Sequence, residues 1–159
     1  MRLWIVRHGK ADQHSPTGRD FDRPLLPRGQ QQATWLGQTI ATKNRKPAII
    51  FSSGLQRAIT TARLIQSALN CELEIVQGLE TGHSVTEAIN LIAERAATQG
   101  VMVVGHNPTF GELVWVLEQG LPAREAQMRT GEAVVFDFDN GFGPGKGTLH
   151  KRLRMDDDE

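Results

Sequence analysis

Mostly apolar runs of strand length alternate with amphipathic stretches along the chain. The runs are residues 3–6, 48–51, 73–76 and 101–104. Between them, apolar residues recur every three or four positions, which is the spacing of one helix face. These stripes run from Ala33 to Ile40, from Ala58 to Leu69, from Val85 to Ala96 and from Phe110 to Leu117. The alternation predicts an α/β layered domain with a largely parallel sheet.

The pattern changes after Gly120. Residues 132–139 and 146–153 are strand-like, and the connection between them is rich in Gly and contains Pro144, which predicts an antiparallel hairpin. No repeat or linker divides the chain. We therefore expect one domain over residues 1–154, and a disordered acidic tail at 155–159 because like-charge runs are usually solvated.

Composition and charge exclude several classes of protein. The 159 residues are 39% hydrophobic and 23% charged, with a formal net charge of zero. This is typical of a globular domain and gives no reason to expect nucleic-acid binding. No apolar stretch is long enough to cross a bilayer, and the N-terminus lacks the pattern of a signal peptide, so no membrane association is expected. Cys71 is the single cysteine, which favours a reducing, cytoplasmic setting.

Metal and cofactor sites are not predicted. Outside the candidate site described next, His14, His83 and His150 lack ligand spacing with Cys, Asp or another His. We therefore expect neither a metal nor another cofactor. Nothing in the sequence requires more than a monomer.

Residues suited to phosphoryl chemistry follow three of the predicted strands directly. Arg7-His8-Gly9 follows the first, the segment 52–57 that ends in Arg57 follows the second, and Gly105-His106-Asn107 follows the run 101–104. In open α/β sheets, ligands bind beyond the carboxyl ends of the strands. Two histidines and two arginines are therefore expected to meet at one edge of the sheet.

His8 is the candidate nucleophile of this group. A neutral imidazole can attack phosphorus through one nitrogen while a backbone carbonyl orients the other, and nearby cations disfavour its protonation. Arg57, at a helix start, can bind two phosphoryl oxygens. His106, as a cation or donor, can stabilise charge on the transferring oxygens. We expect Gly9 to let the backbone approach the phosphate closely.

Several ordered motifs resemble the histidine phosphatase superfamily, and within it most closely the small SixA-type protein-histidine phosphatases. They are Arg7-His8-Gly9-Lys10-Ala11, Asp22-Arg23-Pro24-Leu25, Pro27-Arg28-Gly29, Leu55-Gln56-Arg57-Ala58 between Ser52 and Thr61, and Val104-Gly105-His106-Asn107-Pro108. The resemblance implies a three-layer α/β/α sandwich of the phosphoglycerate-mutase-like type. It also implies a phosphohistidine at His8 that water hydrolyses, with Arg7, Arg57 and His106 holding the phosphoryl oxygens without a metal. We expect substrate binding by Gly9, Ser52, Asn107 and Arg23.

Two positions depart from the family pattern. Ser53-Gly54 stands where Ser-Pro is common, and Leu26 stands where Thr is frequent. The first is expected to loosen the approach to Arg57 without removing it.

Glu80 is the candidate general acid. Mutase and phosphomonoesterase relatives use a glutamate to protonate the leaving oxygen, but Glu80 directly follows Leu79 where their motif usually has one intervening residue. An alkoxide needs such an acid, which contributes roughly 10²–10⁴-fold, whereas an imidazole leaves with little help. A site without a strong acid therefore favours phosphohistidine over phosphoester substrates.

Three functional hypotheses remain open from the sequence. The favoured one is a metal-independent phosphohistidine phosphatase whose partner is a phosphohistidine-bearing protein, either a phosphorelay carrier or a sugar-transport phosphocarrier. The absence of a long insertion between the motifs predicts an open pocket suited to such a partner. The second is a small-molecule phosphomonoesterase or mutase that uses Glu80 as its acid. The third is a non-catalytic module that binds phosphohistidine, which retention of His8 and both arginines argues against.

Overall fold

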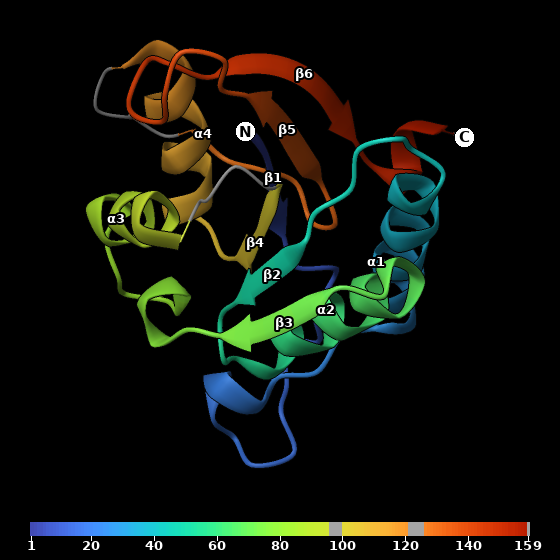
Figure 1. Ribbon diagram of the computed structural model, residues 1–159. Coiled ribbons are helices and arrows are strands. Elements are labelled where there is room, and N and C mark those ends of the chain that lie inside the picture. The colour runs from blue at the N-terminus through green and yellow to red at the C-terminus, as the bar shows by residue number, and fades with distance from the viewer. Residues whose placement is uncertain (96–99, 121–125, 159) are drawn as a thin grey trace.

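The computed structural model describes residues 1–95, 100–120 and 126–158, so Ala96, the last residue of the third predicted helical stripe, lies outside the described residues. Within these residues the chain forms a six-stranded sheet in the order β3-β2-β4-β1-β5-β6 (Figure 1). The strands are β1 (Arg2–Arg7), β2 (Ile49–Ser52), β3 (Glu72–Ile75), β4 (Val101–Gly105), β5 (Ala133–Asp137) and β6 (Thr148–Leu153). The helices are α1 (Pro27–Ala41), α2 (Gln56–Leu69), α3 (Val85–Arg95) and α4 (Thr109–Gln119), with short 3-10 turns at η1 (Asp20–Asp22), η2 (Gln77–Leu79) and η3 (Met155–Asp158).

The sheet is mainly parallel. β1 pairs in parallel with β4, and β2 pairs in parallel with both β3 and β4. β5 is antiparallel to β1, and β6 is antiparallel to β5, which confirms the predicted late hairpin. Arg7 lies opposite Gly105, and Ser52 lies opposite Val104, so the carboxyl ends of β1, β2 and β4 meet at one edge.

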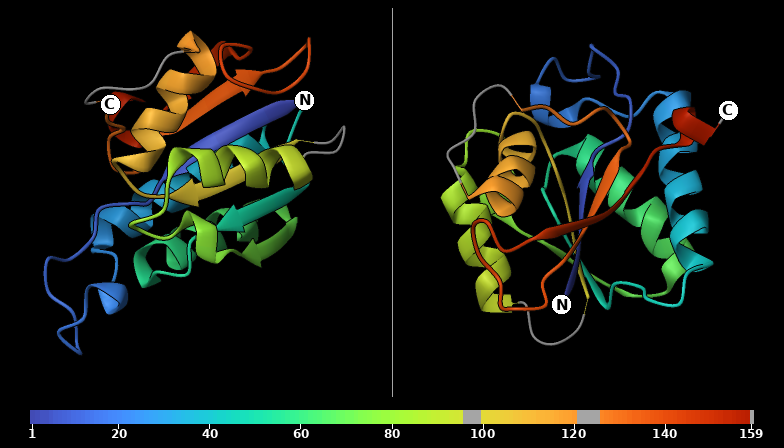
Figure 2. Two further views of the ribbon diagram at one scale, coloured as in Figure 1. Left: turned by 90° about the vertical axis from the view of Figure 1, so that its left-hand side faces the viewer. Right: turned by 90° about the horizontal axis from the view of Figure 1, so that it is seen from above.

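Two helical layers cover the faces of this sheet, and Figure 2 shows the helices on either side of the strands. Side chains alternate between the faces of a strand, and β1 illustrates the consequence. Leu3 and Ile5 pack in one buried cluster with α3 and α4, whereas Trp4 and Val6 pack in another with α1 and α2. Because both faces of the sheet are buried, the sequences of β1 and β4 contain uninterrupted runs of apolar residues. The predicted three-layer α/β/α sandwich is confirmed.

The C-terminal residues differ from the expected disordered tail. Met155–Asp158 form the short turn η3. The Asp156 carboxylate pairs with Arg28 and Arg154, and the Asp157 carboxylate pairs with Arg129. The local charge run suggested disorder because the sequence did not reveal that cations from distant segments lie beside it. Glu159 lies outside the described residues.

None of the helices in the described part of the chain is long and apolar enough to span a membrane.

Candidate active site

His8 lies directly after β1, with 7% of its surface exposed. Its backbone N–H donates to the Gly105 carbonyl, which extends the β1–β4 pairing to the site. Its ring Nδ1 lies 2.7 Å from the Gly9 carbonyl oxygen. A carbonyl can only accept, so Nδ1 carries the hydrogen and Nε2 of the neutral ring carries a lone pair. The sequence-based expectation of a carbonyl-oriented imidazole therefore has a matching geometry.

The surroundings of His8 keep its imidazole neutral. Burial, followed by the nearby guanidinium groups of Arg57, Arg7 and Arg23, lowers the pKa of His8 to about 4, although the bond to the Gly9 carbonyl acts in the opposite direction. Both effects disfavour a buried cation beside other cations. His8 is therefore an unprotonated base at neutral pH.

His106 follows β4 and lies beside His8, with ring centroids 5.1 Å apart. Its Nε2 is 2.7 Å from the Ser53 hydroxyl, whereas its buried Nδ1 has no hydrogen-bond partner among the described residues. Burial, and then the proximity of His8 and Arg57, lower the pKa of His106 to about 3. Of the two roles expected for His106, the structure favours a neutral hydrogen-bonding group over a cation.

Arg7 contributes a second buried polar atom of this kind. Its Nη1 donates to the Met128 carbonyl at 2.9 Å, while its buried Nε has no partner in the described part of the chain. Burial, and then repulsion from Arg57, lower the pKa of the Arg7 guanidinium. Buried polar groups in folded proteins are nearly always hydrogen-bonded, so an unpartnered N–H in a site indicates a place for a ligand acceptor.

Arg57 lies in the first turn of α2 and is 5% exposed. Its Nη1 donates to the Asp20 carbonyl at 2.9 Å and its Nη2 donates to the Asp20 carboxylate at 3.1 Å. Arg23 contacts the same residue through its Nη1, which is 3.0 Å from the other Asp20 carboxylate oxygen. The structure thus brings together the four predicted catalytic residues and links Arg57 to Arg23 through Asp20, which the sequence analysis did not single out.

Gly9 packs closely against the start of α1. A Cβ at Gly9 would lie 2.5 Å from the carbonyl oxygen of Gly29 in α1, which is closer than packed atoms approach. The Gly9 N–H also donates to the Thr61 hydroxyl, which in turn donates to the Arg57 carbonyl. These contacts give Gly9 a packing role that joins the His8 segment to α1 and α2, beside which its closeness to a phosphate stays a prediction.

Ser52 and Asn107 are at the correct edge of the sheet, but their polar groups are used within the protein. The fully buried Ser52 hydroxyl donates to the Ser53 carbonyl. The Asn107 amide donates to the Met128 carbonyl, and its oxygen accepts from the Met128 N–H. The hydroxyl that contacts His106 belongs to Ser53, which was not predicted to take part in catalysis or substrate binding.

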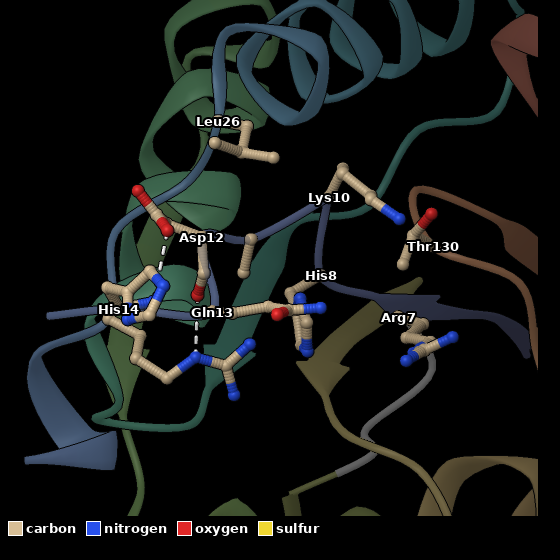
Figure 3. Close-up of a pocket in the computed structure, with 10 residues that line it drawn as sticks. Arg7, His8, Lys10, Asp12, Gln13, His14, Leu26 and Thr130 are labelled. Carbon is tan, nitrogen blue, oxygen red and sulfur yellow. Dashed lines mark hydrogen bonds between the residues drawn. The ribbon is translucent and has the colours of Figure 1, made fainter.

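A cleft of about 380 Å³ opens beside His8 and Arg7. Figure 3 shows Lys10, Gln13 and His14 around it, on the loop that leads from β1 towards α1. The same loop holds Arg23, whose Nε donates to the Asp12 carbonyl. Arg57 and His106 are not among the residues that line this cleft. His8 therefore lies between a wall of buried groups and a loop with several cationic side chains.

Glu80 does not line this cleft. It follows η2 and is half-buried, and a Cβ at Gly54 would lie 3.6 Å from its Oε1. Its carboxylate therefore lies near the loop that precedes Arg57. Among the described residues, no group of three or more His, Cys, Asp or Glu side chains is arranged to hold a metal ion.

Three contributors were missed for identifiable reasons. Thr61 belongs to the motif that begins at Ser52 but was given no role at the site, although it lies four residues after Arg57 and helical spacing places both on one face of α2. Ser53 is adjacent to Ser52, and only the end of β2 decides which hydroxyl faces His106. Asp20 gave no local signal, because its contact with Arg57 spans 37 positions of the chain.

Comparisons with known proteins agree with this geometry. The model of the histidine phosphatase superfamily (branch 1) matches residues 3–83, just over half of the chain. The structure of a protein assigned as the phosphohistidine phosphatase SixA from Agrobacterium tumefaciens is similar, with 27% identity, a TM-score of 0.80, and coverage of 96% of this chain and 97% of that one.

Two further structures at lower identity share the fold. One is the protein histidine phosphatase SixA in complex with tungstate, with 23% identity, a TM-score of 0.80 and complete coverage of both chains. The other is a protein assigned as an α-ribazole-5′-P phosphatase from Escherichia coli, with 22% identity, a TM-score of 0.74, and coverage of 94% and 95%. From its family match, its fold and its His8 site together, this chain belongs to the histidine phosphatase superfamily.

Proposed function

We propose that this protein is a phosphohistidine phosphatase that transfers the phosphoryl group of its substrate to Nε2 of His8. One observation carries the proposal: two buried nitrogens without partners among the described residues, Arg7 Nε and His106 Nδ1, accompany a neutral imidazole whose other nitrogen is oriented. A phosphoryl group on His8 offers three anionic oxygens to such donors.

The reaction takes two steps at phosphorus. In the first, the Nε2 lone pair of His8 forms a P–N bond while the bond from phosphorus to the substrate imidazole breaks. The leaving imidazole takes a proton from the solvent. In the second, water attacks phosphorus and the P–Nε2 bond breaks, which releases inorganic phosphate and restores neutral His8. The low pKa of His8 keeps the nucleophile available throughout the neutral range.

The buried donors act on the charge of the transferring group. When the Ser53 hydroxyl donates to His106 Nε2, the neutral ring carries its hydrogen on Nδ1 and can donate to a phosphoryl oxygen. Arg7 offers its Nε–H, and Arg57 offers N–H groups that Asp20 does not use. Donors fixed before the reaction stabilise the developing charge more than mobile ones, because they need not reorganise.

Phosphohistidine is the favoured substrate class because no glutamate is among the described residues that line the cleft beside His8. An imidazole leaving group tolerates this better than an alkoxide. The similarity to the A. tumefaciens SixA protein supports the same choice. The partner is then a protein that presents a phosphohistidine to the cleft, and the reaction proceeds without a metal ion in a cytoplasmic setting.

A small phosphorylated metabolite is the second candidate substrate. The specific observation in its favour is the size of the cleft, about 380 Å³, with Lys10 and Arg23 available for a second anionic group. In that case Glu80, near Gly54, would have to reach the leaving oxygen.

A turnover assay distinguishes the two candidates. The protein is incubated with a phosphohistidine-bearing carrier protein and, separately, with a panel of phosphoester metabolites, in both cases with a metal chelator present. We expect faster phosphate release from the carrier protein, and a Glu80→Gln variant that retains this activity. Preference for a phosphoester, with loss of activity in Glu80→Gln, would establish the second candidate instead. Binding of the carrier without phosphate release would indicate a non-catalytic module.

A further inference from the structure

Asp20 contacts two of the arginines at the site with three of its oxygens. Its backbone carbonyl accepts from Arg57 Nη1 at 2.9 Å, and one carboxylate oxygen accepts from Arg57 Nη2 at 3.1 Å. The other carboxylate oxygen accepts from Arg23 Nη1 at 3.0 Å. These bonds link the first turn of α2 to the loop that lines the cleft.

The turn around Asp20 is itself closed by the same carbonyl. The Arg23 N–H donates to the Asp20 carbonyl at 3.2 Å, which fixes the start and the end of η1 relative to each other. Arg57 is almost completely buried beneath this turn, whereas the Asp20 side chain remains 58% exposed. The carboxylate therefore lies at the boundary between the buried arginine and the solvent.

Both guanidinium groups keep donors for a ligand. A guanidinium has five N–H bonds. Arg57 donates one N–H from each of its terminal nitrogens to Asp20. Arg23 donates its Nε–H to the Asp12 carbonyl and one N–H of its Nη1 to the Asp20 carboxylate. The remaining N–H bonds of both residues are not taken by other described residues. Because a guanidinium is planar, fixing part of it fixes the direction of the rest.

Asp20 is also unsuited to be the missing general acid. Partial burial acts to raise its pKa, but hydrogen bonds from Arg23 and Arg57 outweigh this and hold the pKa of the carboxyl below its usual range. Asp20 is therefore ionised at neutral pH and has no proton to give to a leaving group.

We propose that Asp20 is a positioning residue that holds the guanidinium groups of Arg57 and Arg23 so that both face the phosphoryl group at His8. This inference rests on the proposed function and adds a residue that acts through the arginines without touching the substrate. An anion near a phosphoryl site weakens binding by repulsion, so its contribution must lie in orientation. The opposite role is that Asp20 competes with the substrate for Arg57, and the two roles predict different kinetics.

The test compares Asp20→Ala, which loses both carboxylate bonds, with Asp20→Asn, which retains an acceptor without the charge. Turnover of a phosphohistidine-bearing carrier protein gives kcat and KM, and calorimetry gives the Kd for inorganic phosphate. We expect Asp20→Ala to lower kcat about ten- to a hundredfold, since misplacing a catalytic group by about 1 Å has effects of this order. The Kd for phosphate should change less than about threefold, because loss of orientation and loss of repulsion oppose each other. Asp20→Asn should recover part of the lost kcat.

Asp22→Ala is the matched control. Asp22 lies in the same turn η1, but its carboxylate accepts from the Thr17 hydroxyl and forms no hydrogen bond or ion pair with Arg23 or Arg57 among the described residues. The kcat of Asp22→Ala should remain within about twofold of that of the wild type. Thermal unfolding of all variants shows which of them are folded. If Asp20→Ala keeps its kcat within twofold of wild type, the proposal is wrong. If it binds phosphate about tenfold more tightly with kcat unchanged, Asp20 is a competitor for Arg57.

A measurement without turnover separates this inference from the proposed function. NMR relaxation of the Nε–H groups of Arg57 and Arg23, in protein saturated with inorganic phosphate, reports how rigid the two side chains are. We expect both to become more mobile in Asp20→Ala than in wild type or Asp22→Ala. If the wild-type protein hydrolyses no phosphohistidine but the mobility increases, the proposed function fails and the positioning role stands. Unchanged mobility overturns the positioning role whatever the substrate is.

Discussion

The two sides of His8 are built in contrasting ways. The inner side consists of His106, Ser53 and Thr61, which are all buried and reach the site from the ends of β4, β2 and from α2. The outer side is the loop from Lys10 to Arg23, where Lys10, His14 and Asp20 are exposed. Buried groups have few alternative rotamers and shifted pKa values, whereas exposed charges are solvated and weakly coupled.

This difference predicts that the inner side carries out the chemical step and that the outer side recognises the rest of the substrate. Bond making and breaking require a fixed protonation state and fixed donors, which burial supplies. Recognition of the rest of the substrate requires a surface that can meet another molecule, which an exposed loop supplies. Substitutions on the inner side should therefore change the chemical step, and those on the outer side should change KM and the salt dependence. Asp20 belongs to the loop but contacts the buried Arg57, so it connects the two sides.

The largest expected effect is that of His8→Ala. Without the imidazole no phosphoryl group can be held on the enzyme, so phosphoenzyme formation should be abolished. Incubation with a ³²P-labelled phosphohistidine protein, followed by denaturing gel electrophoresis, measures the label directly. His14→Ala, on the outer side, is the control and should still be labelled. A labelled His8→Ala protein would show that another residue is the nucleophile.

Arg57→Ala should have the next largest effect. By analogy with the loss of an oxyanion-hole donor, we expect roughly 10²–10³-fold lower kcat, or about 3–4 kcal/mol of transition-state stabilisation. Gln56→Ala is a suitable control, because Gln56 precedes Arg57 in α2 but is exposed and contacts Thr60. Steady-state kinetics on the same carrier protein measure both variants. Turnover near that of wild type in Arg57→Ala would place the phosphoryl site elsewhere.

Gly9→Ala tests whether the inner side depends on close backbone packing. The new Cβ would lie 2.5 Å from the Gly29 carbonyl oxygen, so α1 or the His8 segment must shift. We expect a loss of about 1–3 kcal/mol in the free energy of unfolding, as for other overpacked positions. Urea denaturation measures it, with Gly54→Ala as control because the contacts of its Cβ begin at 3.5 Å. Equal stability of the two variants would contradict the packing role of Gly9.

The two buried imidazoles should make stability depend on pH in a defined window. The folded pKa values, about 4 for His8 and about 3 for His106, lie below the unfolded value of 6.5. Between these values the unfolded chain binds more protons, so the free energy of unfolding should fall as pH is lowered from 6.5 towards 4. Each imidazole contributes a slope of at most about 1.4 kcal/mol per pH unit.

Urea denaturation at several pH values tests this slope. The His8→Ala variant should lose the part of the slope that belongs to His8. An identical slope in wild type and His8→Ala would show that His8 is protonated in the folded protein.

The smallest expected effect is that of Lys10→Ala. Lys10 lines the cleft and is exposed, and exposed charge pairs contribute about 0.2–1 kcal/mol. We therefore expect KM for the phosphohistidine carrier to rise by a few-fold at most and kcat to stay the same, with the difference disappearing at high salt. Kinetics at two ionic strengths measure it. A large loss of kcat in Lys10→Ala would contradict the division between the two sides.

The layer order and most of the site could be predicted from the sequence for a simple physical reason. A strand buried on both faces must be continuously apolar, and a helix that covers it must carry an apolar stripe, so both leave local patterns. Residues that directly follow parallel strands share an edge of the sheet. This rule predicted that Arg7, His8, Arg57 and His106 lie close together.

Other contacts of the site and of the C-terminal residues could not be predicted from local sequence patterns. The Asp20–Arg57 pair, the packing of Gly9 on Gly29, and the ion pairs of Asp156 with Arg28 and of Asp157 with Arg129 join segments 20 to 128 positions apart. Nothing near these residues in the chain indicates their partners. The same holds for the choice between Ser52 and Ser53 as the partner of His106, because it depends on how the end of β2 faces β4.

The sequence by itself thus determined the layered fold, because periodicity and the position of residues after strands are local properties, and its ordered motifs indicated the family and predicted His8 as the nucleophile. The tertiary structure decided the neutral state of both histidines, the orientation of the arginines and the shape of the cleft. These depend on burial and on distances between remote segments, which are set only when the layers pack against one another.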